Sequence, residues 1–521
     1  SAGDLDVTID WGDGSEPEHF VNVQPSHKYA KAGKYTVETK GTASLYCLTD
    51  IAGDYFSITD GIMHVNFLNI ISWGKLGVKD VKSVCKTDEE LESIPDDVCG
   101  TFAEITDFTE MFVNCYSLKA IPENLFKYAV KAKKFYETFA YNASLKSIPE
   151  NLFANCPEVT DFGQCFYGAG TGSSILQGNG NSHANVLKPF VSKGNRIEIP
   201  EGLFRNNTKA TSFMQTFRDM NIASVPENLF ANNTEVTSFN GLFTGCTELE
   251  TVPADLFKNN QKVKDYKWLF YATDVKTLPV GLFKHCPSGF PIQINQMFQN
   301  SIIEDFPEGF FEGLDAVTSL SELFENAVFM KPLKGGIFKG LKKAYSLSQT
   351  FYGINVTELP EDLFDGLGTD ATKVEMSKTF FGCKQLVSLP AGLFDPVATK
   401  LTTINACFQK CTGIKSIPDG FGNLLTVLTN AGNAFYGCES LESLPSEMFK
   451  GAAAKLSNLS SMFWGCTSLK SVPDGLFGFI TVRNANFANC FNACTSLKSV
   501  GADVFPSTVL HIFCIGIAIP L

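Results

Sequence analysis

Cysteine and histidine are the residues of this chain that could bind a metal, form disulfides or act as nucleophiles. The 521 residues include 16 Cys and six His. All but Cys47 and Cys514 occupy positions of an internal repeat where other copies hold Asn or apolar residues. Small buried cysteines are common packing residues, so these thiols are predicted to fill space in the core. Seven of them stand seven residues before a recurring proline or its glycine counterpart: Cys115, Cys246, Cys383, Cys411, Cys438, Cys466 and Cys494.

Neither disulfides nor metal sites are predicted from this pattern. Stacked repeats would hold equivalent Cβ atoms about 4.8 Å apart, beyond the roughly 3.5–4.5 Å of a disulfide. Cys407-x-x-x-Cys411 and Cys490-x-x-x-Cys494 lack a nearby His. No nucleophile motif or phosphate loop surrounds any of the six histidines, His19, His27, His64, His183, His285 and His511. We therefore expect no catalytic residues, no cofactor and no metal, and no enzyme activity.

Aromatic residues at one repeat position are the better candidates for binding. That position directly follows the second Phe of a copy and holds Tyr167, Tyr271, Tyr352, Phe381, Tyr436 and Trp464, with Gln409 interrupting the later run. On stacked coils these side chains would form a stripe that could stack on sugar rings or anchor a protein partner, because aromatic residues dominate binding hot spots. The alternative is that they pack between adjacent turns on the outer face.

The elements that position these residues come from one repeated phrase. GCTELETVPADLFKNN at 245–260 returns as GCESLESLPSEMFKGA at 437–452 and GCTSLKSVPDGLFGFI at 465–480. Its proline recurs every 25–30 residues, apart from one gap of 51 that contains an insertion of about 24 residues. With Gly501 as a final copy there are fifteen repeats, a solenoid signature, at Pro95, Pro122, Pro149, Pro200, Pro226, Pro253, Pro279, Pro307, Pro332, Pro360, Pro390, Pro418, Pro445 and Pro473.

Each copy consists of two halves, and each half is a short extended piece followed by a turn carrying Leu-Phe. The extended pieces fit the rungs of a parallel ladder. The proline is expected to begin a short helix, whose dipole would favour the acidic residue that follows it in nine copies: Asp96, Glu123, Glu150, Glu201, Glu227, Glu308, Glu361, Asp419 and Asp474. Three residues before the proline a lysine column predicts a solvated edge: Lys119, Lys146, Lys276, Lys415, Lys470 and Lys498.

The composition fits the same fold. There are 46 Phe against 14 Tyr and four Trp, so one repeated position must require Phe. A single coil buries too little apolar surface to offset its ordering, whereas stacked coils share a continuous interior. The predicted fold class is therefore a repeat solenoid of the α/β type, with short parallel strands and short helical turns. It is expected over residues 66–521, with about 15 coils and an insertion at 168–196.

Residues 1–65 follow different rules. DVTIDWGDGS at 6–15 alternates and then turns at Gly12-Asp13-Gly14, and HKYAKAGKYTVET at 27–39 supplies another turn and strand. We predict a small all-β, immunoglobulin-like sandwich and a junction. Asp10, Asp13 and Glu16 could hold calcium, or Asp13 could bond the turn backbone instead.

Charge and hydropathy exclude several partner classes. The net charge of −13 argues against nucleic acid, which requires a basic face. The apolar tail VLHIFCIGIAIPL at 509–521 has 13 residues, and a membrane-spanning helix needs about 20. No transmembrane segment is expected, and the tail is predicted to be a last strand or end cap.

Two resemblances agree on location. Trp11 to Gly14, His27, Tyr29, Gly33, Tyr35 and Val37 resemble the WGDG, H-x-Y and A-G-x-Y-x-V signature of PKD-type domains. The phrase C-x-S-L-x-S-[IV]-P-x-x-L-F resembles BspA-like leucine-rich repeats and the bacterial surface-protein repeat of about 26 residues, over roughly 71–505. Both resemblances imply an exported protein at the cell surface or outside the cell, with lipid anchoring one option. The repeat family implies adhesion and has no shared catalytic residues.

These observations predict a non-catalytic binding or adhesion protein that presents a repeat scaffold to a protein partner or host surface, and we expect it to be a monomer. One alternative is a glycan-binding surface protein of a polysaccharide-capture system. The other is a structural element of a surface layer.

Overall fold

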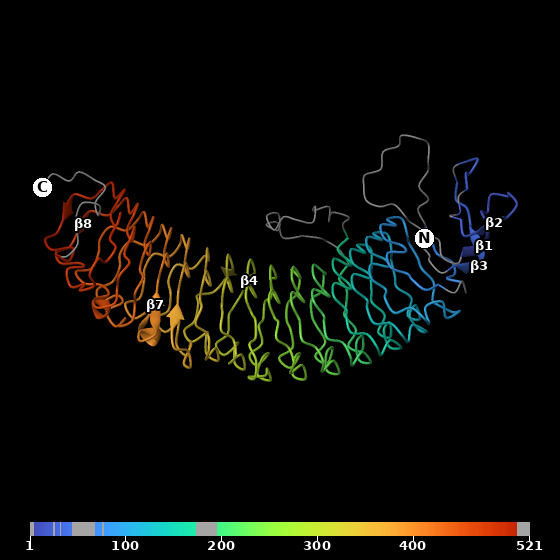
Figure 1. The fold of residues 1–521 in the computed structure, drawn as a ribbon, viewed down its shortest axis with the longest axis horizontal. Coiled ribbons are helices and arrows are strands. Elements are labelled where there is room, and N and C mark those ends of the chain that lie inside the picture. The colour runs from blue at the N-terminus through green and yellow to red at the C-terminus, as the bar shows by residue number, and fades with distance from the viewer. Residues whose placement is uncertain are drawn as a thin grey trace. The chain divides into compact units, whose positions relative to one another are not determined.

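The computed structural model describes residues 5–23, 25, 27–31, 33–43, 68–74, 78–172 and 195–507. The chain divides into two compact units, Ser1–Thr237 and Ser238–Leu521, and both contain coils of the repeat. Figure 1 colours these coils along the chain from blue to red. The boundary predicted near residue 65 and the tail at 509–521 lie outside the described residues, so the division into 1–65 and 66–521 stays a prediction.

The N-terminal residues form one antiparallel sheet in the order β2-β1-β3. Val7 of β1 pairs with Phe20 of β2 and Gly41 of β3, and the side chains of Val7 and Ile9 are buried. Gly12 lies in the predicted turn with φ +73°, which glycine adopts without strain. The described residues of this part contain this single sheet, so a PKD-like sandwich stays a prediction. Strand bounds are β1 Leu5–Asp10, β2 Glu18–Val21 and β3 Glu38–Ala43.

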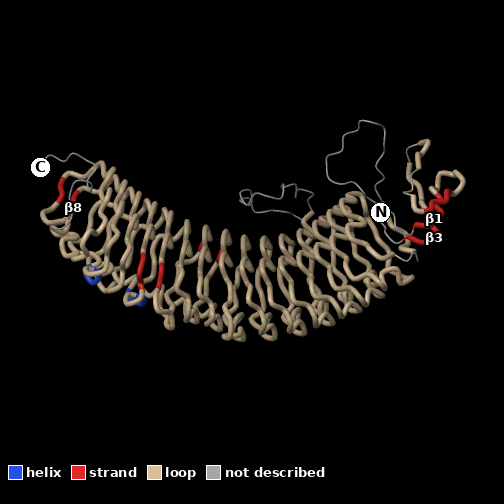
Figure 2. The backbone as a smooth tube through the Cα atoms, viewed as in Figure 1, coloured by secondary structure: helices blue, strands red, loops and turns tan. Residues whose placement is uncertain are grey.

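Each coil contains two short extended stretches that pair in parallel with the same stretches of neighbouring coils. In the N-terminal unit one ladder joins Asp107, Lys134, Asp161 and Ser212. In the C-terminal unit most pairings are single bridges, and the longest form the two-stranded sheets β4–β5, β6–β7 and β8–β9, shown red in Figure 2. Their bounds are β4 Ile302–Ile303, β5 Val328–Phe329, β6 Val374–Glu375, β7 Leu401–Thr403, β8 Ser471–Val472 and β9 Ser499–Val500.

Backbone N–H groups of the extended stretches donate to both neighbouring coils, as Glu375 N to Tyr345 O of the preceding coil shows. Alternate N–H groups from Met376 to Gly382 donate to carbonyls of the following coil, at N···O distances of 2.8–2.9 Å. In the second stretch, Glu442 N donates to the preceding coil at Lys415 O, at 2.9 Å. Successive coils are therefore tied together on both stretches, as the predicted parallel ladder requires.

Stacked phenylalanines form the shared core of each unit. In the N-terminal unit Phe108, Phe135, Phe162 and Phe213 stack with centroids 5.0–5.9 Å apart and ring planes within 12°. In the C-terminal unit eight rings from Phe298 to Phe491 stack at 5.3–5.6 Å, also within 12°. Each of these eight side chains is at most 1% exposed. The predicted phenylalanine interior is confirmed.

The long gap in the repeat is an insertion between directly stacked coils. Asp161 pairs with Ser212, 51 residues later, and Phe166 stacks on Phe217 at 6.2 Å and 6°. The ladder and the core therefore continue as though the extra residues were absent. Of the predicted insertion at 168–196, residues 173–194 lie outside the described part.

The prediction of a short helix after each proline is wrong. Leu125, Lys127 and Ala129 each donate an N–H to the residue three positions earlier, which gives a row of β-turns. A helix would need such bonds at consecutive residues. In the described part only two 3-10 turns occur, at Asp395–Val397 and Lys450–Ala452. No helix among the described residues is long and apolar enough to cross a bilayer.

The acidic residue after the proline consequently has a different role from the predicted one. Glu123 Oε1 accepts a hydrogen bond from Asn151 Nδ2 at 2.7 Å, and Glu201 Oε1 accepts one from Asn228 Nδ2 at 2.8 Å. Each bond joins a coil to the next. These carboxylates therefore link neighbouring coils. The predicted interaction with a helix dipole does not occur, because no helix follows the proline in these coils.

The structure also corrects one position of the repeat alignment. Phe338 stacks between Phe311 and Phe364, at 6.4 and 5.9 Å. Each of those two rings lies four residues after its repeat proline, so the equivalent position in the Phe338 coil is Lys334. Pro332 is two residues out of register.

The lysine column lies on an exposed edge, as predicted, and several of its members form ion pairs along it. Lys119 pairs with Glu92 at 2.6 Å, and Lys470 pairs with Glu442 at 2.5 Å, each on the coil before. All four side chains are about half exposed or more, so these pairs contribute little stability.

Candidate functional site

The aromatic column is the position that follows the second buried Phe of each coil. At Phe381, the preceding Phe380 is fully buried, and Gly382 has a left-handed backbone with φ +72°. Phe381 N donates to Lys378 O at 3.1 Å, which closes a turn at the surface of the coil. The ring of Phe380 is buried, Phe381 closes a turn, and Gly382 is left-handed. The column residue Phe381 therefore lies at the edge of the core.

The structure places all six predicted site residues half-buried, neither fully exposed nor in the core. Tyr352 and Phe381 stack with centroids 4.8 Å apart and planes within 5°. Tyr436 and Trp464 stack at 5.8 Å and 18°. The rings therefore pack on one another along the column while keeping part of their surface open to solvent.

Four of the six residues belong to one continuous stretch. Backbone N–H groups join the coils of Tyr352, Phe381, Gln409, Tyr436 and Trp464 in that order, at 2.7–2.8 Å. We call Tyr352, Phe381, Tyr436 and Trp464 the aromatic stripe. Gln409 lies between its two stacked pairs, as the sequence indicated.

Tyr167 and Tyr271 are not part of this stripe. In the N-terminal unit, Tyr167 lies under the Arg218 guanidinium, which is 4.7 Å from its ring centroid. Its neighbour Tyr141 is 4.6 Å away between centroids. Burial raises the pKa of Tyr167, and the nearby Asp219 raises it further. In the C-terminal unit the hydroxyl of Tyr271 accepts a hydrogen bond from Asn300 Nδ2 at 2.9 Å.

A row of glycines beside the stripe was missed at the sequence level. Each stripe residue is followed by a glycine with φ between +68° and +72°. A Cβ added at Gly382 would meet no other atom within 4 Å, so this part of the surface is bare backbone. The signal was in the sequence, because an aromatic-glycine pair recurs at Gly353, Gly382, Gly437 and Gly465.

Two carboxyl groups lie one coil before Tyr352. Burial raises the pKa of Glu325 to about 7, and the neighbouring Glu322 adds to that shift. Gln296 Nε2 donates a hydrogen bond to Glu322 Oε2 at 2.6 Å. This end of the stripe therefore carries less negative charge near neutral pH than two ordinary glutamates would.

The cysteines act as packing residues in the described part of the chain. None of the 14 described cysteines forms a disulfide, and 12 of them are buried. Cys411 Sγ lies 3.0 Å from Phe380 O and donates to that carbonyl on the coil before, and Cys438 Sγ makes the same contact with Phe408 O at 3.2 Å. Burial raises the pKa of these thiols, so they are poor nucleophiles. Cys47 and Cys514 lie outside the described residues.

The N-terminal carboxylates bond the turn backbone, as the alternative to calcium predicted. Asp13 Oδ1 accepts hydrogen bonds from the backbone N and the hydroxyl of Ser15, at 3.0 and 2.6 Å. Asp10 Oδ1 accepts one from Gly12 N at 2.9 Å. His27 Nε2 lies 2.9 Å from Asp13 Oδ2. Within the described ranges no group of three His, Cys, Asp or Glu residues is arranged to hold a metal.

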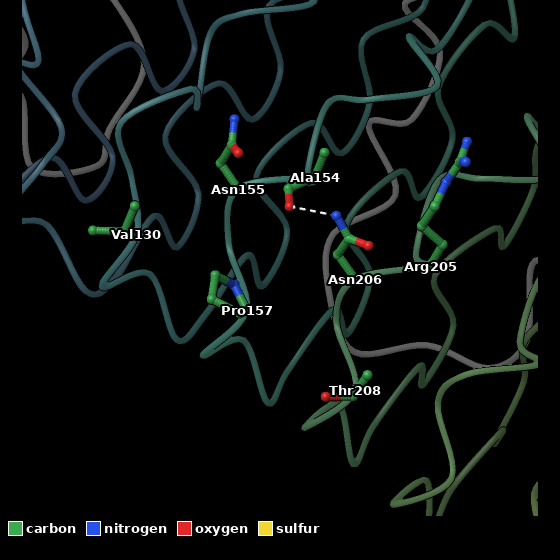
Figure 3. Close-up of a pocket in the computed structure, with 7 residues that line it drawn as sticks. All are labelled: Val130, Ala154, Asn155, Pro157, Arg205, Asn206 and Thr208. Atoms are coloured by element: carbon green, nitrogen blue, oxygen red, sulfur yellow. Dashed lines mark hydrogen bonds between the residues drawn. The ribbon is translucent and has the colours of Figure 1, made fainter.

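Among the described residues, two surface hollows are lined by residues outside the aromatic stripe. The first, of about 460 Å³, lies in the N-terminal unit and has Val130, Pro157, Arg205, Asn206 and Thr208 in its lining, shown in Figure 3. Asn206 Nδ2 donates to Ala154 O at 2.8 Å across its wall. The second, of about 590 Å³, is lined mainly by carboxylates of the C-terminal unit: Glu361, Asp362, Asp365 and Asp395. Neither contains an arrangement of catalytic groups.

Comparison with known proteins adds three solved structures to this picture. No family model and no curated protein matches the sequence. A leucine-rich repeat protein from Bacteroides ovatus is 15% identical, with 89% of this chain and 90% of that chain covered and a TM-score of 0.33. A leucine-rich cell surface protein from Faecalibacterium prausnitzii is 15% identical, with 86% and 95% covered and a TM-score of 0.27.

The third is the leucine-rich repeat ectodomain of the receptor kinase GASSHO1/SCHENGEN3 from Arabidopsis thaliana, in complex with CASPARIAN STRIP INTEGRITY FACTOR 2. It is 12% identical, with 79% of this chain and 56% of that chain covered and a TM-score of 0.27. All three are leucine-rich repeat proteins. The TM-scores are below 0.5, so the solenoid fold of this chain rests on its own ladders and stacked core.

Proposed function

We propose that this chain is a non-catalytic binding protein of the cell exterior that presents its coils to a protein partner or a host surface. The observation that carries this proposal is the aromatic stripe. Four large rings remain partly open to solvent at equivalent positions of one continuous stretch, whereas the phenylalanines beside them are fully buried. Aligned aromatic side chains with an open edge are typical of protein-binding hot spots.

A protein partner fits the stripe better than a sugar. A sugar that stacks on an aromatic residue needs the face of the ring. The facing sides of Tyr352 and Phe381 cover each other, and so do those of Tyr436 and Trp464. These pairs offer a partner their edges, together with the backbone of the adjacent glycines such as Gly382.

The location and the adhesive role are supported by the resemblance to BspA-like repeats and to PKD-type domains. Families of both kinds are mostly found outside the cell, where a repeat scaffold can contact a host surface. We propose an exported or surface-attached protein, with lipid anchoring as one means of attachment.

The direct experiment measures binding of the full chain to immobilised mucin and extracellular-matrix proteins, with and without the stripe. The double variant Tyr436→Ala/Trp464→Ala should lose most of the binding and keep the fold. Tyr345→Ala is the matched control, because Tyr345 is an exposed tyrosine of the same unit outside the stripe. Equal binding by the wild type and the double variant would show that the stripe is not the binding surface.

Two other functions make different predictions for the same samples. A glycan-capture protein would bind oligosaccharides on an array and lose that binding in the double variant, whereas we expect no such binding. A structural surface-layer element would self-associate, whereas we expect a monomer at high concentration in analytical ultracentrifugation.

A further inference from the structure

The interruption of the aromatic stripe is filled by the side chain of Lys410. Gln409 occupies the column position of this coil, and Lys410 follows it at the position of the glycine row. The ammonium group lies 5.7 Å from the ring centroid of Phe381. The lysine Cγ is 3.7 Å from the place where a Cβ on Gly437 would lie. Lys410 thus extends over the surface between the two stacked ring pairs.

The backbone at Lys410 is of a kind that glycine would adopt more easily. Lys410 has φ +61°, in the left-handed region, where a side chain adds strain. The equivalent residues of the four coils that carry the stripe are all glycine. Ala272, Asn300 and Ala493 are left-handed at the same position of other coils, so the conformation belongs to the repeat and Lys410 differs from them in carrying a charge.

The charge of Lys410 is not neutralised by the described part of the protein. No carboxylate there lies within ion-pair distance of Lys410, and the same holds for Lys378, an exposed residue three positions before Phe381. By contrast, several exposed lysines of this unit pair with a carboxylate at 2.5–2.8 Å, namely Lys373, Lys450 and Lys470. The carboxyl pair Glu322 and Glu325 belongs to a coil three positions away along the stack.

We infer that the aromatic stripe binds an acidic segment of a partner protein, with Lys410 contacting a carboxylate of that segment. This inference rests on the proposed function and deepens it by naming the partner chemistry. Apolar or aromatic side chains of the segment pack on the ring edges on either side, and an Asp or Glu reaches the ammonium group between them. A positive charge flanked by apolar surface favours such a segment, because the contact is partly shielded from water. A neutral segment lacks that contact.

The probe for this inference is a library of random 12-residue peptides displayed on phage, selected on the full chain. The selected peptides should be enriched in Asp and Glu next to aromatic or aliphatic residues. A labelled selected peptide, measured by fluorescence anisotropy, should bind Lys410→Gly at least about tenfold more weakly than the wild type, the effect typical of one charge-assisted contact. Replacing its Asp and Glu by Asn and Gln should have a similar effect on the wild type.

A stability measurement on Lys410→Gly and one control variant separate this contact from changes in folding and net charge. Lys410→Gly relieves a left-handed backbone, so its thermal stability should be unchanged or higher while binding falls. Lys415→Ala removes the same charge from the exposed lysine column, and it should bind the peptide like the wild type.

The outcomes distinguish the inference from the proposed function. Selected peptides without acidic residues, or equal affinity for Lys410→Gly, would overturn the inference. If Tyr436→Ala/Trp464→Ala still weakened the binding of those peptides, the proposed function would stand. If no peptide binds and only an anionic oligosaccharide does so through the stripe, both would be overturned.

Discussion

Replacing Phe351 with alanine tests the claim that stacked phenylalanines hold neighbouring coils together. The ring is fully buried between Phe324 and Phe380, 5.3 Å from each and parallel within 6°. A buried Phe→Ala change costs about 3–5 kcal/mol. Because the ring also stacks on parallel neighbours on both sides, each stack being worth about 0.5–1.5 kcal/mol, we expect a cost in the upper part of that range, about 4–5 kcal/mol.

Phe351→Leu separates the contribution of stacking from that of volume. Leucine fills most of the site but forms no ring stack, so its expected cost is about 1–3 kcal/mol from the two lost stacks. Phe491→Ala is a second comparison, because Phe491 has a parallel partner, Phe463, on one side. It should cost about 1 kcal/mol less than Phe351→Ala.

The assay is urea unfolding followed by far-UV circular dichroism, fitted with a model of interacting neighbouring repeats because a solenoid can unfold in parts. A destabilisation below about 1 kcal/mol for both Phe351 variants would refute the reasoning, since it would mean that the rings are not packed as the structure shows.

Three further predictions address other features. Hydrogen bonds from Ser15 and His27 hold the pKa of Asp13 well below its usual range. Its carboxylate therefore stays ionised in the folded N-terminal sheet at pH values where it is protonated in the unfolded chain. Its stability should be present above pH about 4 and fall at lower pH, a dependence that a tryptophan-fluorescence titration should find reduced in Asp13→Asn. Iodoacetamide should modify the exposed Cys99 in the native chain, as peptide mapping would show, and the buried Cys411 only after unfolding. Gly382→Val should cost about 1–2 kcal/mol in thermal unfolding and Gly382→Asn less, because the site has space for a side chain but a left-handed backbone.

The general fold could be predicted because the same physical requirement recurs in every coil. A phenylalanine at a fixed period must lie inside when its neighbours in the stack supply the rest of its surroundings. The pairing of Asp161 with Ser212 follows from the same logic, since an insertion can leave the stack without breaking the ladder.

The local backbone could not be predicted in the same way. A proline followed by an acid is typical of a helix start, but after Pro122 the chain forms turns whose side-chain bonds reach the next coil. The choice depends on partners about 27 residues away, which no local window contains. The aromatic column could be identified from its spacing in the sequence. The placement of Lys410 over Phe381, which lies on the preceding coil, could be found only from the structure.

The repeated backbone hydrogen bonds between coils have a consequence for how such a chain can change in length. Each coil bonds to the following coil through the same backbone positions that join it to the preceding coil. Removing the 28 residues 383–410 would join Gly382 to Cys411 and restore the motif of an aromatic residue, glycine and cysteine. Gain or loss of one period in the gene would therefore shift the spacing of surface features while preserving the backbone hydrogen-bond pattern between coils.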